Sequence, residues 1–483
     1  MVAQLSHKFV RSLPWAMGEA FFNTLYGVSV VVVIGRFIAP VELGAASTAI
    51  ATVALIEVVS SAGLQEAVVR SRSADTDVTD TAFIMAMTFA VLGMVVCYLA
   101  ALGVAAAFGD RRLIALVLVA SLLLPFNALA AVPSAILRRK MRAGVLTRRI
   151  IAGKILGLFT LSIAGVSGLG SWSMVLANLA TSLGSLVMIL MAMNRWPRMR
   201  FARQEAGELL HFGAMVSAET ILYTIITRTF GLLFGYFHGL AALGNFQLAV
   251  RLADEVANLI HNTVARFGLS FFAGKERMAA DTKSSFLTGT QLIMAVTTPL
   301  FTGIALVAYD FTAVAFGSRW EASAPFIQII AISMVAGFQN ILVGPVLRAR
   351  GQQTILVSYA AFAAGFVMIS CIATAQMPAI FGVIGFGSKQ FLFAPFIALT
   401  IQRHLQISLK MQFTNVIGPL AAAASMAIAV MGFQLSLAGA VPIIRLVGSI
   451  MIGMIVYPIA LWFLSPAVVA GAKSLLLRYN KGG

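Results

Sequence analysis

Fourteen apolar runs divide the sequence, and they constrain the fold more than any other feature. A helix needs roughly 20 predominantly apolar residues to cross the hydrocarbon core of a bilayer. Of the 483 residues, 60% are hydrophobic and only 11% are charged, whereas about a quarter of a soluble domain is charged. We therefore predict an all-α, polytopic membrane protein with about 14 transmembrane helices. The runs lie at residues 12–36, 44–69, 81–108, 113–137, 150–168, 172–193, 211–236, 243–271, 285–309, 322–347, 354–375, 379–402, 413–434 and 441–464.

The distribution of Lys and Arg gives these helices a direction. The stretch from Val132 to Lys154 carries seven cations and no acid, and short cationic loops stay on the inner side of a membrane. With the N-terminus inside, 25 of the 34 cations fall in inner segments and four in outer turns. This bias predicts that both termini are cytoplasmic. It also accounts for the net charge of +17 without nucleic acid as a partner, because the inner leaflet is anionic.

No sequence feature indicates a cofactor or a metal site. Cys97 and Cys371 lie far apart inside apolar spans and form neither a disulfide framework nor a metal motif. The GFG triplet at 385–387 lies in an apolar span and is no phosphate-binding loop. Cations precede the first apolar run, which continues to about Ile38 without a convincing cleavage site. We therefore expect this run to be a spanning helix and not a removed signal.

An internal repeat with a spacing of 200 residues divides the chain into two halves. Matched positions are Glu19/Glu219, Thr24/Thr224, Gly35/Gly235, Phe37/Phe237, Leu43/Leu243, Gly44/Gly244 and Ala49/Ala249. Repeated six-helix bundles that face each other across a central cavity are an arrangement that many transporters use. We predict an N-terminal lobe at 1–194, a cytoplasmic linker at 195–208, a C-terminal lobe at 209–408, and two extra helices with a cytoplasmic tail at 409–483.

Several stretches resemble a known family. They are GLQEAVVRSRSADTDVTDTAF (63–83), PSAILRRKMR (133–142), GLGSWSMVLANL (168–179), LGNFQLAVRL (243–252) and GVIGFGSKQFLFAPFIALTIQRHLQIS (382–408). In their order and spacing they are similar to the polysaccharide transporters, the Wzx-like flippases of the multidrug/oligosaccharidyl-lipid/polysaccharide (MOP) exporter superfamily. The resemblance implies export of undecaprenyl-pyrophosphate-linked repeat units across the bacterial cytoplasmic membrane. Implied partners are the lipid-linked oligosaccharide, membrane lipids, and the polymerase and export machinery of a polysaccharide pathway.

A polar stripe marks the run at 243–271 as a candidate wall of the cavity. Polar residues recur there at three- and four-residue steps, which places them on one helix face. Ionisable groups at membrane depth are costly and usually face a cavity or a partner. The alternative is a structural stripe in which Arg251 is neutralised by the neighbouring acids. The stripe comprises Arg251, Asp254, Glu255, Asn258, His261 and Asn262, with Arg266 at its inner end.

Other intramembrane charges supply candidates for substrate binding and ion coupling. Arg228, Lys389 and Arg445 have no acid within a helical turn, and unpaired cations suit a pyrophosphate. Arg228 and Lys389 join Arg251, Asn258, Asn262 and Arg266 as predicted substrate-binding residues, whereas Arg445 is also placed to reach the outer interface. Carboxylates that exchange protons with a gradient are candidates for coupling. The coupling candidates are Glu19, Glu57, Asp254, Glu255 and His261.

Three alternative functions were weighed against the flippase. A multidrug or peptidoglycan-precursor exporter shares the superfamily, and the basic stretch with the quoted segments favours the polysaccharide branch. A membrane polysaccharide polymerase or ligase would carry a large outer loop, whereas all outer connections here have about ten residues or fewer. A channel would be expected to have rings of like charge. We therefore predict a transporter and not an enzyme.

Overall fold

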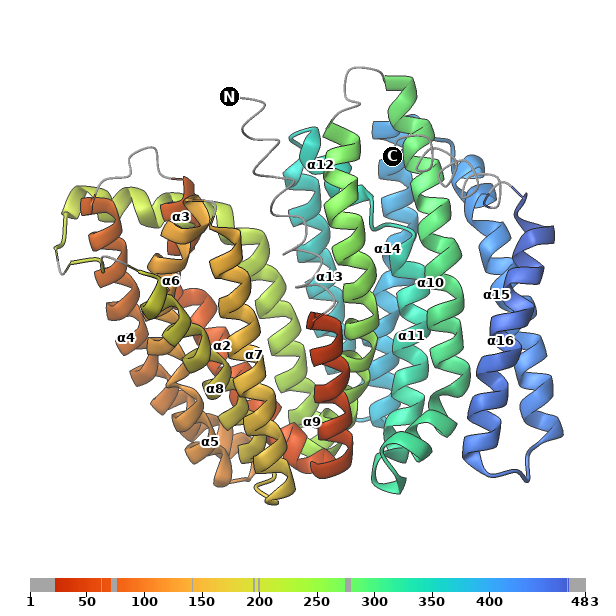
Figure 1. The fold of residues 1–483 in the computed structure, drawn as a ribbon, viewed down its shortest axis with the longest axis horizontal. Helices are drawn as coiled ribbons and strands as arrows, with labels where there is room; N and C mark the ends of the chain where they lie inside the picture. Colours follow the sequence, from red (N-terminus) through yellow and green to blue (C-terminus); the bar gives the residue numbers. More distant parts are fainter. Residues whose placement is uncertain are drawn as a thin grey trace. The chain divides into compact units, whose positions relative to one another are not determined.

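The computed structural model of the chain describes residues 22–61, 63–70, 76–140, 142–193, 196–198, 200–273, 279–466 and 468. These residues form helices, and no strand occurs among them (Figure 1). The chain is divided into two compact units, Met1–Gln247 (unit 1) and Leu248–Gly483 (unit 2).

Each unit is a bundle of long apolar helices. Unit 1 contains helix Phe22–Phe37, α2 (Pro40–Ser61), α3 (Leu64–Arg70), α4 (Thr76–Phe108), α5 (Arg112–Ala120), α6 (Leu123–Arg139), α7 (Ala143–Val166) and α8 (Ser171–Ala192). The long α9 (Arg203–Ala273) passes from unit 1 into unit 2. Unit 2 continues with α10 (Ala279–Ala315), the 3-10 helix η1 (Ser318–Ser323), α11 (Ala324–Phe338), α12 (Val343–Ala349), α13 (Gln353–Ala373), α14 (Ala379–Leu405), α15 (Leu409–Ser436) and α16 (Pro442–Leu464).

The predicted all-α membrane fold is confirmed. Eleven segments among the described residues are long and apolar enough to span a membrane, and helix Phe22–Phe37 is a shorter apolar helix. Large apolar side chains on these helices are exposed, such as Met454 and Phe463 of α16 at 71% and 76%. Such a surface is stable in lipid and not in water. The count of fourteen spans stays a prediction: the runs at 211–236 and 243–271 both lie in α9, where only Gly239 leaves helical geometry, with φ 86°.

Two predicted spans are broken into two helices, and a proline accounts for each break. The run at 113–137 is α5 and α6, separated by a turn at Ser121 and Leu122, and the run at 322–347 breaks at residues 339–342. Proline has no N–H to donate to the carbonyl four residues earlier. Pro125 leaves the carbonyl of Ser121 without that donor, and Pro345 does the same to Ile341.

The 200-residue repeat is visible in the packing of unit 1. Leu43 and Leu243 are 2% and 1% exposed. The matched glycines Gly44 and Gly244 make reciprocal contacts: a Cβ on Gly44 would lie 1.9 Å from the carbonyl oxygen of Leu240, and a Cβ on Gly244 would lie 1.8 Å from that of Pro40. Pro40 and Leu240 are themselves 200 residues apart. The first turn of α2 and the first turn of α9 after its kink at Gly239 therefore cross symmetrically. Small residues permit such close crossings in membranes.

A polar cluster holds the same end of unit 1 together. Glu42 accepts hydrogen bonds from the backbone N–H of Ser171, at 2.9 Å, and from its hydroxyl, at 2.6 Å. The carboxylate therefore satisfies an unpaired donor at the beginning of α8. Arg112 bridges Glu42 and Asp110, at 3.0 and 2.9 Å. Its guanidinium, by donating hydrogen bonds, holds the pKa of the Asp110 carboxyl below its ordinary value of 3.8.

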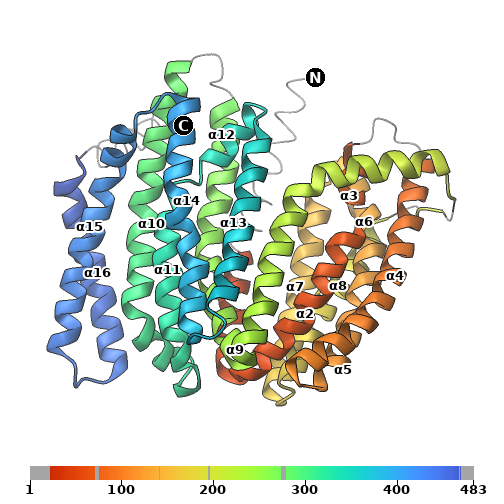
Figure 2. The ribbon, with the colours of Figure 1, turned by 180° about the vertical axis from the view of Figure 1, so that it is seen from behind.

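In unit 2, α10 is bonded along its length to α15 and α16. These helices lie side by side in both views (Figures 1 and 2). The pairing of Arg445 corrects its interpretation as an unpaired cation, because its partner Asp310 comes from another helix. The contacts are Asn415 Nδ2 to the carbonyl of Leu287 (2.8 Å), Tyr457 Oη to that of Ala295 (2.7 Å), Gln434 Nε2 to that of Leu306 (3.1 Å), and Arg445 Nη2 to Asp310 Oδ1 (2.6 Å).

Candidate functional site

Helices α9 and α14 bring Asp254 and Lys389 together inside unit 2. The charges of the two side chains attract each other, although the residues are far apart in sequence. Lys389 Nζ also lies over the ring of Phe386, 3.5 Å from its centroid, in a cation–π contact. The Asp254 side chain is exposed and Lys389 is half-buried. Lys389 was interpreted from the sequence as a cation without an acid, and the structure corrects this point.

The polar stripe of α9 lies on its accessible side, at least from residue 251 to 258. Asp254 and Asn258 are exposed, whereas Ala253 and Ala257 are each 3% exposed. The charges of Arg251 and Glu255 act on Asp254 from the same helix. Between residues 251 and 258 the charged side chains of the predicted stripe are thus Arg251, Asp254 and Glu255, and Asp254 is the one that acts on Lys389. His261, Asn262 and Arg266 also belong to α9, but their side chains lie outside the described residues.

A second polar cluster surrounds Glu57 of α2 in unit 1. Asn127 Nδ2 of α6 donates to the Glu57 carboxylate at 2.8 Å, and the Ser182 hydroxyl of α8 donates to the side-chain oxygen Oδ1 of Asn127 at 3.0 Å. The charge of Arg228 on α9 also acts on Glu57. Arg228 therefore has an acid in its surroundings, which corrects its interpretation as unpaired. Glu19, the other N-terminal coupling candidate, lies outside the described residues.

Cations of the basic stretch contact unit 1 itself. Lys154 donates to the side-chain oxygen of Asn23 at 2.8 Å and lies 4.7 Å from the centroid of the Tyr26 ring. Arg149 donates to the Ser134 hydroxyl at 2.6 Å. These bonds tie α7 to helix Phe22–Phe37 and to α6. The stretch predicted as a cytoplasmic loop thus contributes to the packing of the bundle as well as to its charge bias.

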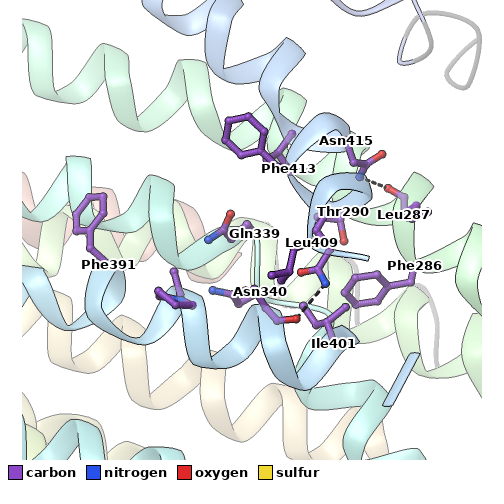
Figure 3. A pocket seen from close by; sticks show the side chains of 15 residues that line it. Phe286, Leu287, Thr290, Gln339, Asn340, Phe391, Ile401, Leu409, Phe413 and Asn415 are labelled. Atoms are coloured by element: carbon purple, nitrogen blue, oxygen red, sulfur yellow. Dashed lines mark hydrogen bonds between the residues drawn. The ribbon is translucent and has the colours of Figure 1, made fainter. Parts of the chain in front are cut away.

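Unit 2 also contains an uncharged pocket of about 360 Å³ between α10, α14 and α15 (Figure 3). None of the predicted site residues lines it. Apolar side chains such as Phe286, Phe391 and Phe413 form most of its wall, and Gln339 and Asn340 come from the break between α11 and α12. Because the lining carries no ionised group, this pocket is suited to hydrocarbon and not to a phosphate. We therefore place the candidate site at the charged clusters.

The sequence missed the partners that position the charged groups. Ser182 and Asn127 carry no distinctive pattern in the sequence. The only signal for the Glu57 cluster in the sequence is that Glu57, Asn127 and Ser182 are polar residues within three apolar runs, 44–69, 113–137 and 172–193. Among the described residues, no group of three His, Cys, Asp or Glu side chains is arranged to hold a metal ion.

Comparisons with known proteins give the site its context. The family model described as "Polysaccharide biosynthesis protein" matches residues 33–325. The chain is 26% identical to the teichuronic acid biosynthesis protein TuaB of Bacillus subtilis over 259 residues, which cover 50% of each chain. It is 22% identical to the succinoglycan biosynthesis transport protein ExoT of Rhizobium meliloti, over 62% of this chain and 61% of that protein. The matched part thus spans between half and two thirds of these relatives.

Solved structures show the fold. The lipid II flippase MurJ in an inward closed conformation superposes with a TM-score of 0.76 at 12% identity, covering 94% of this chain and 99% of that one. An inward-facing multidrug MATE transporter of the MOP superfamily gives a TM-score of 0.62 at 14% identity, covering 80% and 95%. The family and these neighbours contain transporters and flippases, not enzymes. The chain therefore belongs to the polysaccharide biosynthesis protein family and is a multi-pass membrane protein with the fold of these MOP-superfamily structures.

Proposed function

We propose that this protein moves undecaprenyl-pyrophosphate-linked polysaccharide repeat units from the inner to the outer leaflet of the bacterial cytoplasmic membrane. It does so by alternating access, with both termini in the cytoplasm. The membrane-spanning helices and the relatives' roles in teichuronic acid and succinoglycan biosynthesis support this proposal. Polymerase and export machinery of the same pathway are its proposed partners.

The observation that carries the proposal is the electrostatic attraction between the Asp254 and Lys389 side chains in unit 2. An ionised group inside a membrane is costly, and a pair of them is retained where it serves a function. A balanced pair replaced by apolar residues is often neutral or stabilising, so packing alone gives little reason to keep it. Both side chains remain accessible, as a substrate-binding pair requires.

The pair would bind an anionic headgroup by exchange of partners. Without substrate, Asp254 neutralises Lys389. A pyrophosphate carries more charge and more acceptor oxygens than a carboxylate, so it competes for the Lys389 ammonium. Arg251, one turn before Asp254, would then take over the displaced carboxylate. Asn258, exposed on the next turn, extends the polar surface toward Asn262 and Arg266, which complete the proposed set.

Ion coupling follows from the same exchange. An Asp254 carboxylate displaced from Lys389 gains a cation, either a proton or a metal ion, more readily than a paired one. Glu57 offers a second site in unit 1, where Asn127 holds its carboxylate and Arg228 adds a positive charge. Glu255, His261 and Glu19 complete the proposed coupling groups. Substrate binding at Lys389 would thus favour cation binding at Asp254.

The test is a flipping assay in sealed vesicles. The purified protein is reconstituted with a fluorescent polyprenyl-pyrophosphate-linked oligosaccharide, and a membrane-impermeant quencher reports the transferred headgroup. Loss of a charged hydrogen bond costs about 1.5–3 kcal/mol, so Lys389→Ala should slow transfer by roughly 10- to 150-fold. Arg228→Ala should also slow transfer, and Arg228→Lys should restore it only in part, because a point charge lacks bidentate geometry.

Two controls separate function from structure. Lys410→Ala removes an exposed cation at the beginning of α15 and should leave the rate unchanged. The double variant Asp254→Leu with Lys389→Met should insert and fold normally yet fail to transfer the headgroup. Full activity in the double variant would assign the pair a structural role. Transfer of a peptidoglycan precursor in place of the oligosaccharide would favour the peptidoglycan-precursor exporter.

A further inference from the structure

The crossing of residues 40–44 with residues 240–244 in unit 1, here called the glycine crossing, has no side chain at its centre. Each glycine touches the main chain of the opposite helix at the first helical turn, and both glycines are buried. The two contacts are the same to within a tenth of an ångström, with a built Cβ 1.9 and 1.8 Å from the opposing carbonyl oxygen. No real Cβ fits at such a distance, so the crossing closes only when both positions are glycine.

The nature of the contact makes it suited to repeated opening. Among the described residues, no ion pair or hydrogen bond joins Gly44 to Leu240 or Gly244 to Pro40. What remains is dispersion and weak Cα–H···O attraction, and both fall off steeply with distance. The crossing is therefore tight in fit but weak in energy, unlike the Glu42–Ser171 and Glu42–Arg112 bonds beside it.

We propose that the glycine crossing is a reversible latch that closes the outer end of the transport path. This inference rests on the proposed alternating access, because only a path that opens outward has to part the crossing. The predicted topology places residues 36–44 and 237–244 at the outer side. The two halves of the repeat supply one helix each, so one symmetric contact fastens both. A Cβ at either glycine holds the latch open.

The chain provides both the variants and their matched controls. Gly44→Ala and Gly244→Ala place a methyl group against backbone atoms. Gly103 and Gly303 are also 200 residues apart in helices, and a Cβ on either meets nothing within 4 Å. Gly103→Ala and Gly303→Ala therefore test the same chemical change without the contact.

The experiment measures the separation of the two helices. Spin labels at Val41→Cys and Ala241→Cys, both exposed, are read by pulsed electron resonance in lipid nanodiscs. Cys97 and Cys371 are replaced, although both are buried. Overpacking of this size should shift the equilibrium from the short to the long separation by roughly 5- to 150-fold. The shift should be similar for Gly44→Ala and Gly244→Ala, and absent in the two control variants.

Several outcomes overturn the latch: an unchanged short separation in a folded Gly44→Ala protein, a shift from only one of the two glycines, or an equal shift in the controls. Should the alanine variants not fold, a short thiol cross-linker between residues 41 and 241 of the otherwise native protein gives the answer. Locking the crossing should abolish transfer of the labelled lipid-linked oligosaccharide, and full transfer would refute the latch. The distance measurement needs no substrate. The expected shift in the alanine variants, together with no oligosaccharide transfer by the native protein, would refute the proposed function and keep the latch.

Discussion

Removal of either partner of the Asp310–Arg445 pair should destabilise unit 2, and by unequal amounts. Asp310 is 8% exposed and Arg445 is 27% exposed, and Arg445 Nε and Nη2 both donate to the same carboxylate oxygen, at 3.1 and 2.6 Å. Breaking a buried ion pair costs about 3–5 kcal/mol because the remaining charge is left without compensation. Arg445→Met leaves the more deeply buried Asp310 carboxylate without a partner, so its loss of unfolding free energy should reach that range.

Asp310→Asn should cost less, about 1–3 kcal/mol, since the guanidinium keeps solvent contact and a bond to the carbonyl of Ala438 at 3.2 Å. The double variant Asp310→Leu with Arg445→Met removes both charges and should recover most of the loss. The free energy of unfolding can be measured in detergent by denaturant titration, with the fluorescence of the fully buried Trp320 as one signal. Equal small losses that simply add in the double variant would refute this account of the pair.

Three further predictions concern topology, the stripe and pH. Reporter fusions after His238 should report the outside and those at the C-terminus the inside, and an inside signal at His238 would contradict the predicted orientation. A cysteine at Asn258 should react with a water-soluble thiol reagent in membranes whereas one at Ala257, 3% exposed, should not; equal labelling would remove the stripe from the transport path. The pKa of Asp110 is lowered by the Arg112 hydrogen bonds, so its contribution to stability is complete above pH 3.8 and is lost as the pH falls through the lower folded value. Asp110→Asn should abolish this part of the acid sensitivity of unfolding, and an unaltered acid transition would exclude the pair as its source.

The helices could be predicted from the sequence wherever length and apolarity decide. The runs at 81–108, 354–375 and 441–464 correspond to α4, α13 and α16 within a few residues. The segment predicted as a linker, 195–208, is helical from Arg203. Its polarity indicated a loop, but Glu, Gln, Ala and Leu are good helix formers, so α9 begins earlier than the apolar run. The boundary between the predicted lobes stays a prediction.

The charge partners could not be predicted, because they lie on other helices and not within one helical turn of the cation. Arg228, Lys389 and Arg445 each have a carboxylate that acts on them from a helix distant in sequence. Spacing along one helix reports only i±3 and i±4 neighbours, whereas these contacts depend on which helices pack together. The stripe on α9 could be predicted because it lies on one helix. Its role as a binding surface remains a proposal.

The bonds between α10 and the two last helices also set an order of events during synthesis. Arg445 follows Asp310 by 135 residues, which at about 5–20 residues per second takes roughly 7 to 27 s. Until then the carboxylate of an inserted α10 has no arginine, and the carbonyl of Leu306 has no Gln434. During synthesis, α10 therefore enters the membrane before its bonding partners on α15 and α16 exist, and these bonds form only near the end of translation. A ribosome that stops before residue 445 would leave a product in which the Asp310 carboxylate lacks its arginine partner.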